Sequence, residues 1–167
     1  MKLNKNETLV LKLLIENASQ TNVEISKKIG VTPQAVGKIR RRLESDQVIT
    51  GYSAETNFAE IGIKTFAIAL FSYTADTTHQ EKDEDARQSL EKPNIITYSK
   101  IPEGDVTHIV MYGFRDLNEL EEYFQKRQET RGQKSTLKRL YIFSGNGLIK
   151  NTAKKLLTQE LGSRFSK

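Results

Sequence analysis

The sequence predicts an α+β chain of two domains, a small helical domain followed by a domain built around a β-sheet. Three observations lead to this prediction. Capped, helix-forming patterns fill the first 46 residues, and after Gly62 the chain alternates between apolar β-branched or aromatic runs and amphipathic stretches. That alternation follows the order βαββαβ, with one more helix at the end. We therefore expect domains at residues 1–64 and 65–167.

The composition limits the class of protein. Of the 167 residues, 37% are hydrophobic, which is enough for packed cores, and the absence of cysteine excludes disulfides, thiolate metal sites and thiol nucleophiles. No apolar run reaches the roughly 18 residues that span a bilayer, and the N-terminus lacks the apolar core of a signal peptide. We therefore expect a cytoplasmic protein with no membrane partner. The formal net charge of +5 favours a polyanionic partner.

The first two predicted helices carry clear end signals. Residues 3–17 place leucines and an isoleucine on one broad face behind an asparagine cap. Residues 21–30 begin at Thr21 and put Glu24 three positions later, as in a capping box. Gly30 ends this helix and suits the left-handed conformation of a helix C-terminus.

A third helix opens at Thr32 and Pro33, which fit an N-cap followed by proline in the first helical position. Its apolar stripe consists of Val36, Ile39 and Leu43. After it, residues 47–58 alternate apolar and polar side chains around a glycine, which predicts a short β-ribbon. Two helices joined by a glycine turn, a basic third helix and a ribbon are typical of a winged helix-turn-helix.

The third helix concentrates positive charge. With the apolar stripe facing inward, Gln34, Lys38 and Arg41 project from the opposite side, where glutamine suits an adenine edge and the cations suit guanine or phosphate. An ordinary solvated charge run is the alternative, but the agreeing caps, turn and ribbon favour DNA binding. The predicted DNA-binding residues are Thr32, Gln34, Lys38, Arg40, Arg41 and Arg42.

Four strands and two helices are predicted in the second domain. The strands span residues 65–73, 94–101, 106–114 and 137–145, and the helices span 82–92 and 117–129. This order is that of the split βαβ, ferredoxin-like fold. A last helix over 151–165 has a leucine edge that needs a partner, either the domain's own sheet or a second chain.

Nothing in the sequence indicates an enzyme. The two histidines are expected in a surface loop (His79) and at an exposed or interface position of a strand (His108). No GxSxG, HExxH or glycine-rich phosphate loop occurs, and the second domain pairs no nucleophile with a base. We therefore predict no catalytic activity, no cofactor and no metal.

The motifs RLE at 42–44 and VITGYSA at 48–54, together with the helices around them, resemble the DNA-binding half of the leucine-responsive/asparagine regulator (Lrp/AsnC) family. This resemblance covers about the first 64 residues. The βαββαβ half is similar, more distantly, to the ligand-sensing and oligomerisation domain of that family.

The resemblance implies a sequence-specific transcription regulator that binds double-stranded DNA as a homodimer or higher homo-oligomer, is associated with the nucleoid, and responds to an amino acid or another small effector. The effector loop of the family reads Gly, two residues, Asp, whereas here Gly104 and Asp105 are adjacent. These two are the predicted effector-binding residues. The alternative function is an effector-independent architectural protein that organises DNA through the same helix.

Overall fold

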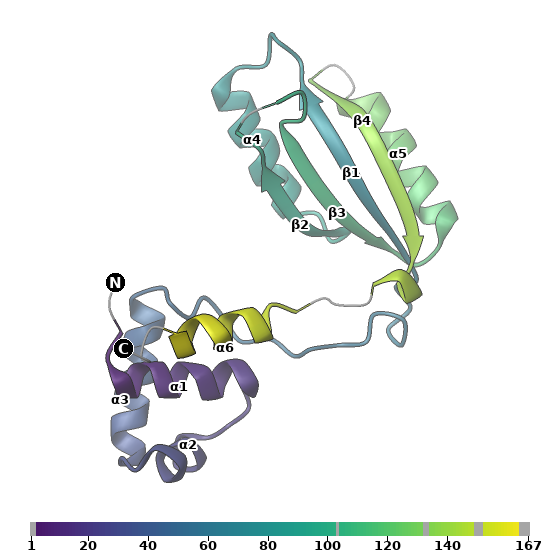
Figure 1. Cartoon of the computed structure of the whole chain (residues 1–167). Helices are drawn as coiled ribbons and strands as arrows, with labels where there is room; N and C mark the ends of the chain where they lie inside the picture. Colours follow the sequence, from purple (N-terminus) through teal and green to yellow (C-terminus); the bar gives the residue numbers. More distant parts are fainter. Residues whose placement is uncertain (1–2, 103, 132–133, 149–151, 164–167) are drawn as a thin grey trace. The chain divides into compact units, whose positions relative to one another are not determined.

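The computed structural model describes residues 3–102, 104–131, 134–148 and 152–163. The chain separates into two compact units (Figure 1). The first contains the chain up to Glu55 together with the C-terminal helix α6 (Lys154–Ser163), and the second begins at Thr56 and contains the sheet. No helix in these described ranges is both long and apolar enough to cross a membrane.

Three short helices in the first unit form as predicted, α1 (Lys5–Glu16), α2 (Asn22–Ile29) and α3 (Pro33–Ser45). Capping explains where each one begins. Asn4, Thr21 and Thr32 each accept a hydrogen bond from the backbone N–H three residues later, and the first two helices complete the capping box with a glutamate. Gly30 ends α2 with φ at +73°, a conformation that glycine adopts without steric cost.

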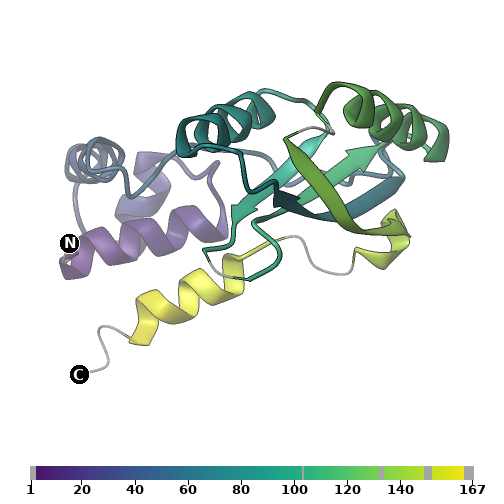
Figure 2. The ribbon, with the colours of Figure 1, turned by 90° about the horizontal axis from the view of Figure 1, so that it is seen from above.

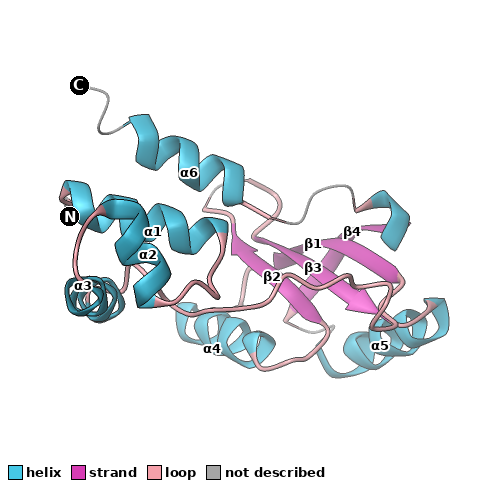
Figure 3. Ribbon diagram, turned by 90° about the horizontal axis from the view of Figure 1, so that it is seen from below, coloured by secondary structure: helices cyan, strands magenta, loops and turns pink. Residues whose placement is uncertain are grey.

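The core of the first unit is one apolar cluster shared by α1, α2 and α3. Its buried members are Val10, Leu11, Leu14, Ile25, Val36 and Leu43. We expected the last helix in the domain of residues 65–167, but α6 lies along α1 (Figure 3) and packs Leu161 against this cluster. Leu161 thus finds an apolar partner in the first unit, whereas Leu156 and Leu157 of the same helix remain exposed. The division into functional domains at residues 64 and 65 stays a prediction.

The segment after α3 differs from its prediction. The backbone N–H groups of Val48 and Ile49 both donate to the Leu43 carbonyl, which turns the chain away from the helix. None of the described residues 47–58 lies in a strand, so the predicted β-ribbon is not formed. The alternating pattern is present, but the extended residues pair with no second strand among the described residues.

A four-stranded antiparallel sheet in the order β2-β3-β1-β4 forms the second unit, which confirms the split βαβ prediction. The strands are β1 (Thr65–Tyr73), β2 (Ile95–Lys100), β3 (His108–Phe114) and β4 (Ser135–Ser144). Figure 2 shows the helices α4 (His79–Leu90) and α5 (Leu117–Arg131) on the same face of this sheet. A short 3-10 turn, η1 (Gly145–Gly147), follows β4.

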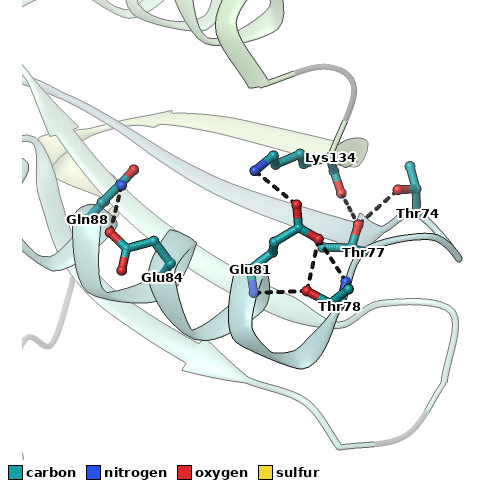
Figure 4. A network of polar contacts seen from close by, with 7 residues as sticks. All are labelled: Thr74, Thr77, Thr78, Glu81, Glu84, Gln88 and Lys134. Atoms are coloured by element: carbon teal, nitrogen blue, oxygen red, sulfur yellow. Dashed lines mark hydrogen bonds and ion pairs between the residues drawn. The ribbon is translucent and has the colours of Figure 1, made fainter.

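Helix α4 begins three residues earlier than the predicted Lys82. Thr78 is its N-cap, and Glu81 accepts hydrogen bonds from the Thr78 backbone N–H and hydroxyl, both at 3.0 Å. The Glu81 carboxylate also pairs with Lys134 Nζ at 3.2 Å, which links the start of α4 to the residue before β4 (Figure 4). The predicted start was wrong because the capping box formed by Thr78 and Glu81 precedes it.

The two faces of the sheet have different surroundings. Alternate residues of β1 and β3 pack with α5 into a buried core whose members are Ala67, Ala69, Phe71, Val110, Tyr112, Phe114 and Leu120. The intervening positions point to the opposite face. That face carries half-buried Ile68 and Leu70 from β1, half-buried Ile109 and Met111 from β3, and exposed Tyr141 from β4.

His108 is buried, so its predicted exposed or interface position is wrong. Its side chain lies on the helix-covered face, where the ring centroids of Phe71, Tyr73 and Tyr98 are 4.6–5.2 Å away. Its Nδ1 is 3.1 Å from the Thr107 hydroxyl. Strand alternation alone could not predict which face of the sheet His108 occupies. A polar ring was expected on the exposed face, but aromatic side chains surround it on the buried one.

Candidate nucleic-acid interface

A hollow of about 900 Å3 follows the exposed side of α3. Thr32 starts the helix by accepting a hydrogen bond from the Ala35 N–H at 3.2 Å, and this fixes the direction in which the following side chains leave the helix. Thr32 itself is not part of the hollow, so its place in the structure is that of a cap.

Gln34, Lys38 and Arg41 line this hollow together and are all exposed. They are spaced four and then three residues apart, which puts them on one face of a helix. Val36 and Leu43, fully buried on the other face, hold that orientation. The structure therefore brings together the three side chains predicted to reach base edges and phosphates.

Arg40, which is also predicted to bind DNA, is held by neighbouring side chains. It is half-buried, and its Nη1 donates a hydrogen bond to the Asn22 Oδ1 on α2 at 2.9 Å. Its guanidinium carbon lies 5.5 Å from the centre of the Tyr52 ring, within range of a cation–π interaction. Arg40 lines the hollow, and its guanidinium contacts Asn22 and Tyr52, although its buried Nε has no hydrogen-bond partner among the described residues.

Arg42 does not line the hollow. Its Nη1 lies 2.8 Å from the Glu7 Oε1, and its Nε lies 3.4 Å from the Asp46 carboxylate one turn later. The Glu7 side chain is only 3% exposed and the Arg42 side chain is 59% exposed. Arg42 therefore covers a buried carboxylate of α1, and its two ion pairs hold the guanidinium outside the hollow lined by Gln34, Lys38 and Arg41.

Glu44 and Tyr52 were missed by sequence reasoning. Tyr52 donates its hydroxyl hydrogen to the Glu44 Oε1 at 2.7 Å, and both residues line the hollow. Burial and the hydrogen bond to Glu44 raise the pKa of the Tyr52 hydroxyl, while nearby Arg40 opposes that rise. The hydroxyl therefore stays protonated at neutral pH. The only signal in the sequence was an aromatic residue within a polar segment.

The predicted effector residues lie in the second unit. Gly104 has φ at +110°, a conformation that side chains rarely adopt, and Asp105 is exposed in the loop before β3. The pKa of Arg139 on β4 is raised, first by its hydrogen bond to the Tyr141 hydroxyl and also by the Asp105 carboxylate. Over the described part of the chain, no group of three or more histidines and carboxylates could hold a metal ion.

Comparison with known proteins gives sequence and fold relatives. Residues 3–50 match the family model described as "Winged helix-turn-helix DNA-binding". An HTH-type transcriptional regulator of Pyrococcus furiosus is 33% identical over 122 residues, which cover 72% of this chain and 76% of the relative. The HTH-type transcriptional regulator LrpA of Pyrococcus horikoshii is 26% identical over 109 residues, 65% of this chain and 72% of LrpA.

The fold also matches solved structures over nearly the whole chain. A transcriptional regulator of Neisseria meningitidis, solved in complex with L-Met, superposes with a TM-score of 0.76. The match covers 92% of this chain and 96% of that one, at 18% sequence identity. At this low sequence identity, the comparison shows only that the two proteins share a fold.

Proposed function

This chain belongs to the Lrp/AsnC family of transcription regulators, and we propose that it binds its target DNA as a homodimer or higher homo-oligomer through α3. In a two-fold assembly, two α3 helices enter successive major grooves, so the target is pseudo-palindromic. The expected site of action is the cytoplasm, in association with the nucleoid.

One observation carries this proposal, the joint exposure of Gln34, Lys38 and Arg41 along one hollow of α3. We assign Arg41 and Lys38 to phosphates or guanine, and Gln34, nearest the helix N-terminus, to a base edge. Phosphate contacts supply affinity that falls steeply with salt, whereas base contacts supply the sequence preference. Thr32 acts through its cap, by fixing where α3 begins.

The face of the sheet opposite α4 and α5, called the bare face below, supports self-association. Four half-buried apolar side chains, Ile68, Leu70, Ile109 and Met111, lie together on two central strands. No described helix of the second unit packs there, because α4 and α5 both lie on the other face (Figure 2). A contiguous apolar patch of this kind is typical of a contact between protein chains. We assign it to the contact between two copies.

An amino-acid effector is the finer part of the proposal. The related regulator of Neisseria meningitidis was solved with L-Met. In this chain the pKa of Arg139 is raised by its hydrogen bond to Tyr141 and, to a smaller extent, by the Asp105 carboxylate. An acidic and a basic side chain in one region suit the ammonium and carboxylate of a free amino acid. Gly104 leaves the backbone of this loop unobstructed by a side chain.

The test is the binding of random-sequence duplex DNA by the full chain over a series of salt concentrations. Arg41→Ala is expected to weaken binding to every sequence and to reduce the salt slope by about 0.9 for each phosphate that is no longer neutralised. Lys12→Ala, which removes a cation from α1, is the control and is expected to leave the slope unchanged. If Arg41→Ala and the unmodified chain show the same salt slope, α3 is not the DNA-binding interface.

A further inference from the structure

Tyr52 is the only aromatic side chain among the described residues that line the hollow beside α3. The residue is 48% exposed. It belongs to the extended segment after α3, in which residues 50–54 make no backbone hydrogen bond to other described residues. The position of Tyr52 therefore depends on its side-chain contacts.

Two side chains of α3, one turn apart, hold Tyr52. The Arg40 guanidinium carbon lies 5.5 Å from the ring centre, and the Glu44 carboxylate accepts the hydroxyl hydrogen at 2.7 Å. A cation on the ring and a charged acceptor at the hydroxyl fix both the ring and its far end. Tyr52 is thus fastened along the same helix that carries Gln34, Lys38 and Arg41.

Arg40 is itself anchored to the neighbouring helix. Its Nη1 donates to the Asn22 Oδ1 at 2.9 Å. Gly37 makes room for this contact, because a Cβ at that position would lie 3.1 Å from the Asn22 Nδ2. The guanidinium therefore connects α2, α3 and the segment that carries Tyr52.

We propose that Tyr52 is a further DNA-contacting residue and that Arg40 is a positioning residue, which acts through Tyr52 and makes no phosphate contact of its own. This inference rests on the proposed function of α3. The exposed part of the ring lies at the hollow that DNA occupies, where it packs against the sugar–phosphate backbone beside the groove. Arg40, which already interacts with Asn22 and Tyr52, neutralises no phosphate when DNA binds.

Counterion release separates the two roles. A cation that contacts a phosphate adds about 0.9 to the slope of log affinity against log salt, whereas a positioning residue adds nothing. The experiment measures this slope for the full chain on random-sequence 30-base-pair duplex DNA, with Arg40→Gln, Arg41→Gln, Tyr52→Ala and the double variant Arg40→Gln/Tyr52→Ala. Arg41 is the matched control, because it is the adjacent arginine on the same helix and is exposed.

Arg40→Gln and Tyr52→Ala are each expected to weaken binding about five-fold at every salt concentration, with the slope of the unmodified chain. The double variant is expected to bind no more weakly than the worse single variant, because both changes remove one arrangement. Arg41→Gln is expected to lower the slope. If Arg40→Gln does not fold, Tyr52→Ala and Tyr52→Phe decide, with the smaller loss expected for phenylalanine, which keeps the ring on Arg40.

A slope lowered by Arg40→Gln as much as by Arg41→Gln would overturn the positioning role, and so would additive losses in the double variant. Unchanged affinity in Tyr52→Ala would remove Tyr52 from the DNA contact. In all of these cases a lowered slope in Arg41→Gln leaves the proposed function intact. An unchanged slope in Arg41→Gln instead contradicts the proposed function, and this inference with it.

Discussion

The Arg42 guanidinium on α3 lies 2.8 Å from the buried Glu7 carboxylate on α1. Glu7 also accepts a hydrogen bond from the Asn4 backbone N–H at 2.8 Å, so a single carboxylate caps one helix and holds another. This contact explains why Arg42 does not line the hollow beside α3, although the two arginines before it do. Arg40 faces α2, Arg41 faces solvent, and Arg42 faces α1.

Arg42→Ala is expected to destabilise the first unit without changing the salt slope of DNA binding. The substitution leaves the buried Glu7 carboxylate without its cation, and the half-exposed position of Arg42 limits the loss to about 1–2 kcal/mol of unfolding free energy. Denaturant unfolding measures the loss, and Arg87→Ala on the surface of α4 serves as the control. A lowered salt slope with unchanged stability would instead place Arg42 on DNA.

Gly30→Ala is expected to lower the unfolding free energy by about 1 kcal/mol. A Cβ at this position would meet no atom within 4 Å, so the cost comes from the backbone φ of +73° alone. Gly51→Ala is the matched control, since a Cβ there also meets no atom and its φ is not positive. Equal stability of the two variants would argue against the left-handed turn between α2 and α3.

The interactions of Glu81 are expected to make the free energy of unfolding decrease in acid. Hydrogen bonds from Thr78, and then the ion pair with Lys134, hold the pKa of the Glu81 carboxyl below its ordinary value of 4.5. Its charged form therefore stabilises the folded state in full above the unfolded-state pKa. That contribution disappears as the pH falls from about 4.5 through the folded-state pKa.

Glu81→Gln is accordingly expected to be less stable than the unmodified chain at pH 7 and to approach it below about pH 4. Unfolding by denaturant at a series of pH values gives the difference, and Glu121→Gln on the exposed side of α5 is the control. A difference that stays constant from pH 7 to acid would contradict the role of the ionised carboxylate.

Ile109→Glu is expected to shift the protein toward the monomer. Ile109 is half-buried on the bare face of the sheet, so a glutamate there would place a charge in the proposed contact between two copies. Sedimentation at several concentrations measures the assembly state, with Leu117→Glu at the start of α5 as an exposed control. An unchanged assembly state would move the contact to another surface.

The predictable parts of the molecule are those set by neighbours in the sequence. The caps and the Gly30 turn predicted α1, α2 and α3, because helix ends depend on local backbone chemistry. The order of the apolar runs predicted the sheet topology, because consecutive elements are joined by short connections. The face of Gln34, Lys38 and Arg41 was predictable for the same reason, since helical spacing alone puts these residues together.

The remainder depends on contacts between distant residues. Arg40 meets Asn22 and Arg42 meets Glu7 across 18 and 35 positions, which no helical spacing predicts. His108 is buried because aromatic residues of β1 and β2 surround it. The prediction of a β-ribbon after α3 was wrong because an alternating pattern forms strands only where a partner strand is available.

The most direct test of the central claim is to select fragments bound by the purified full chain from random DNA at moderate salt, in parallel with its Gln34→Ala variant. We expect a symmetric motif with half-sites about one helical turn, roughly 10 base pairs, apart. We also expect the variant to change the preferred base at one position of each half-site while losing little affinity. Diffuse enrichment with no motif would contradict the account and favour an architectural protein that coats DNA without reading it. An identical motif from the variant would remove Gln34 from base recognition.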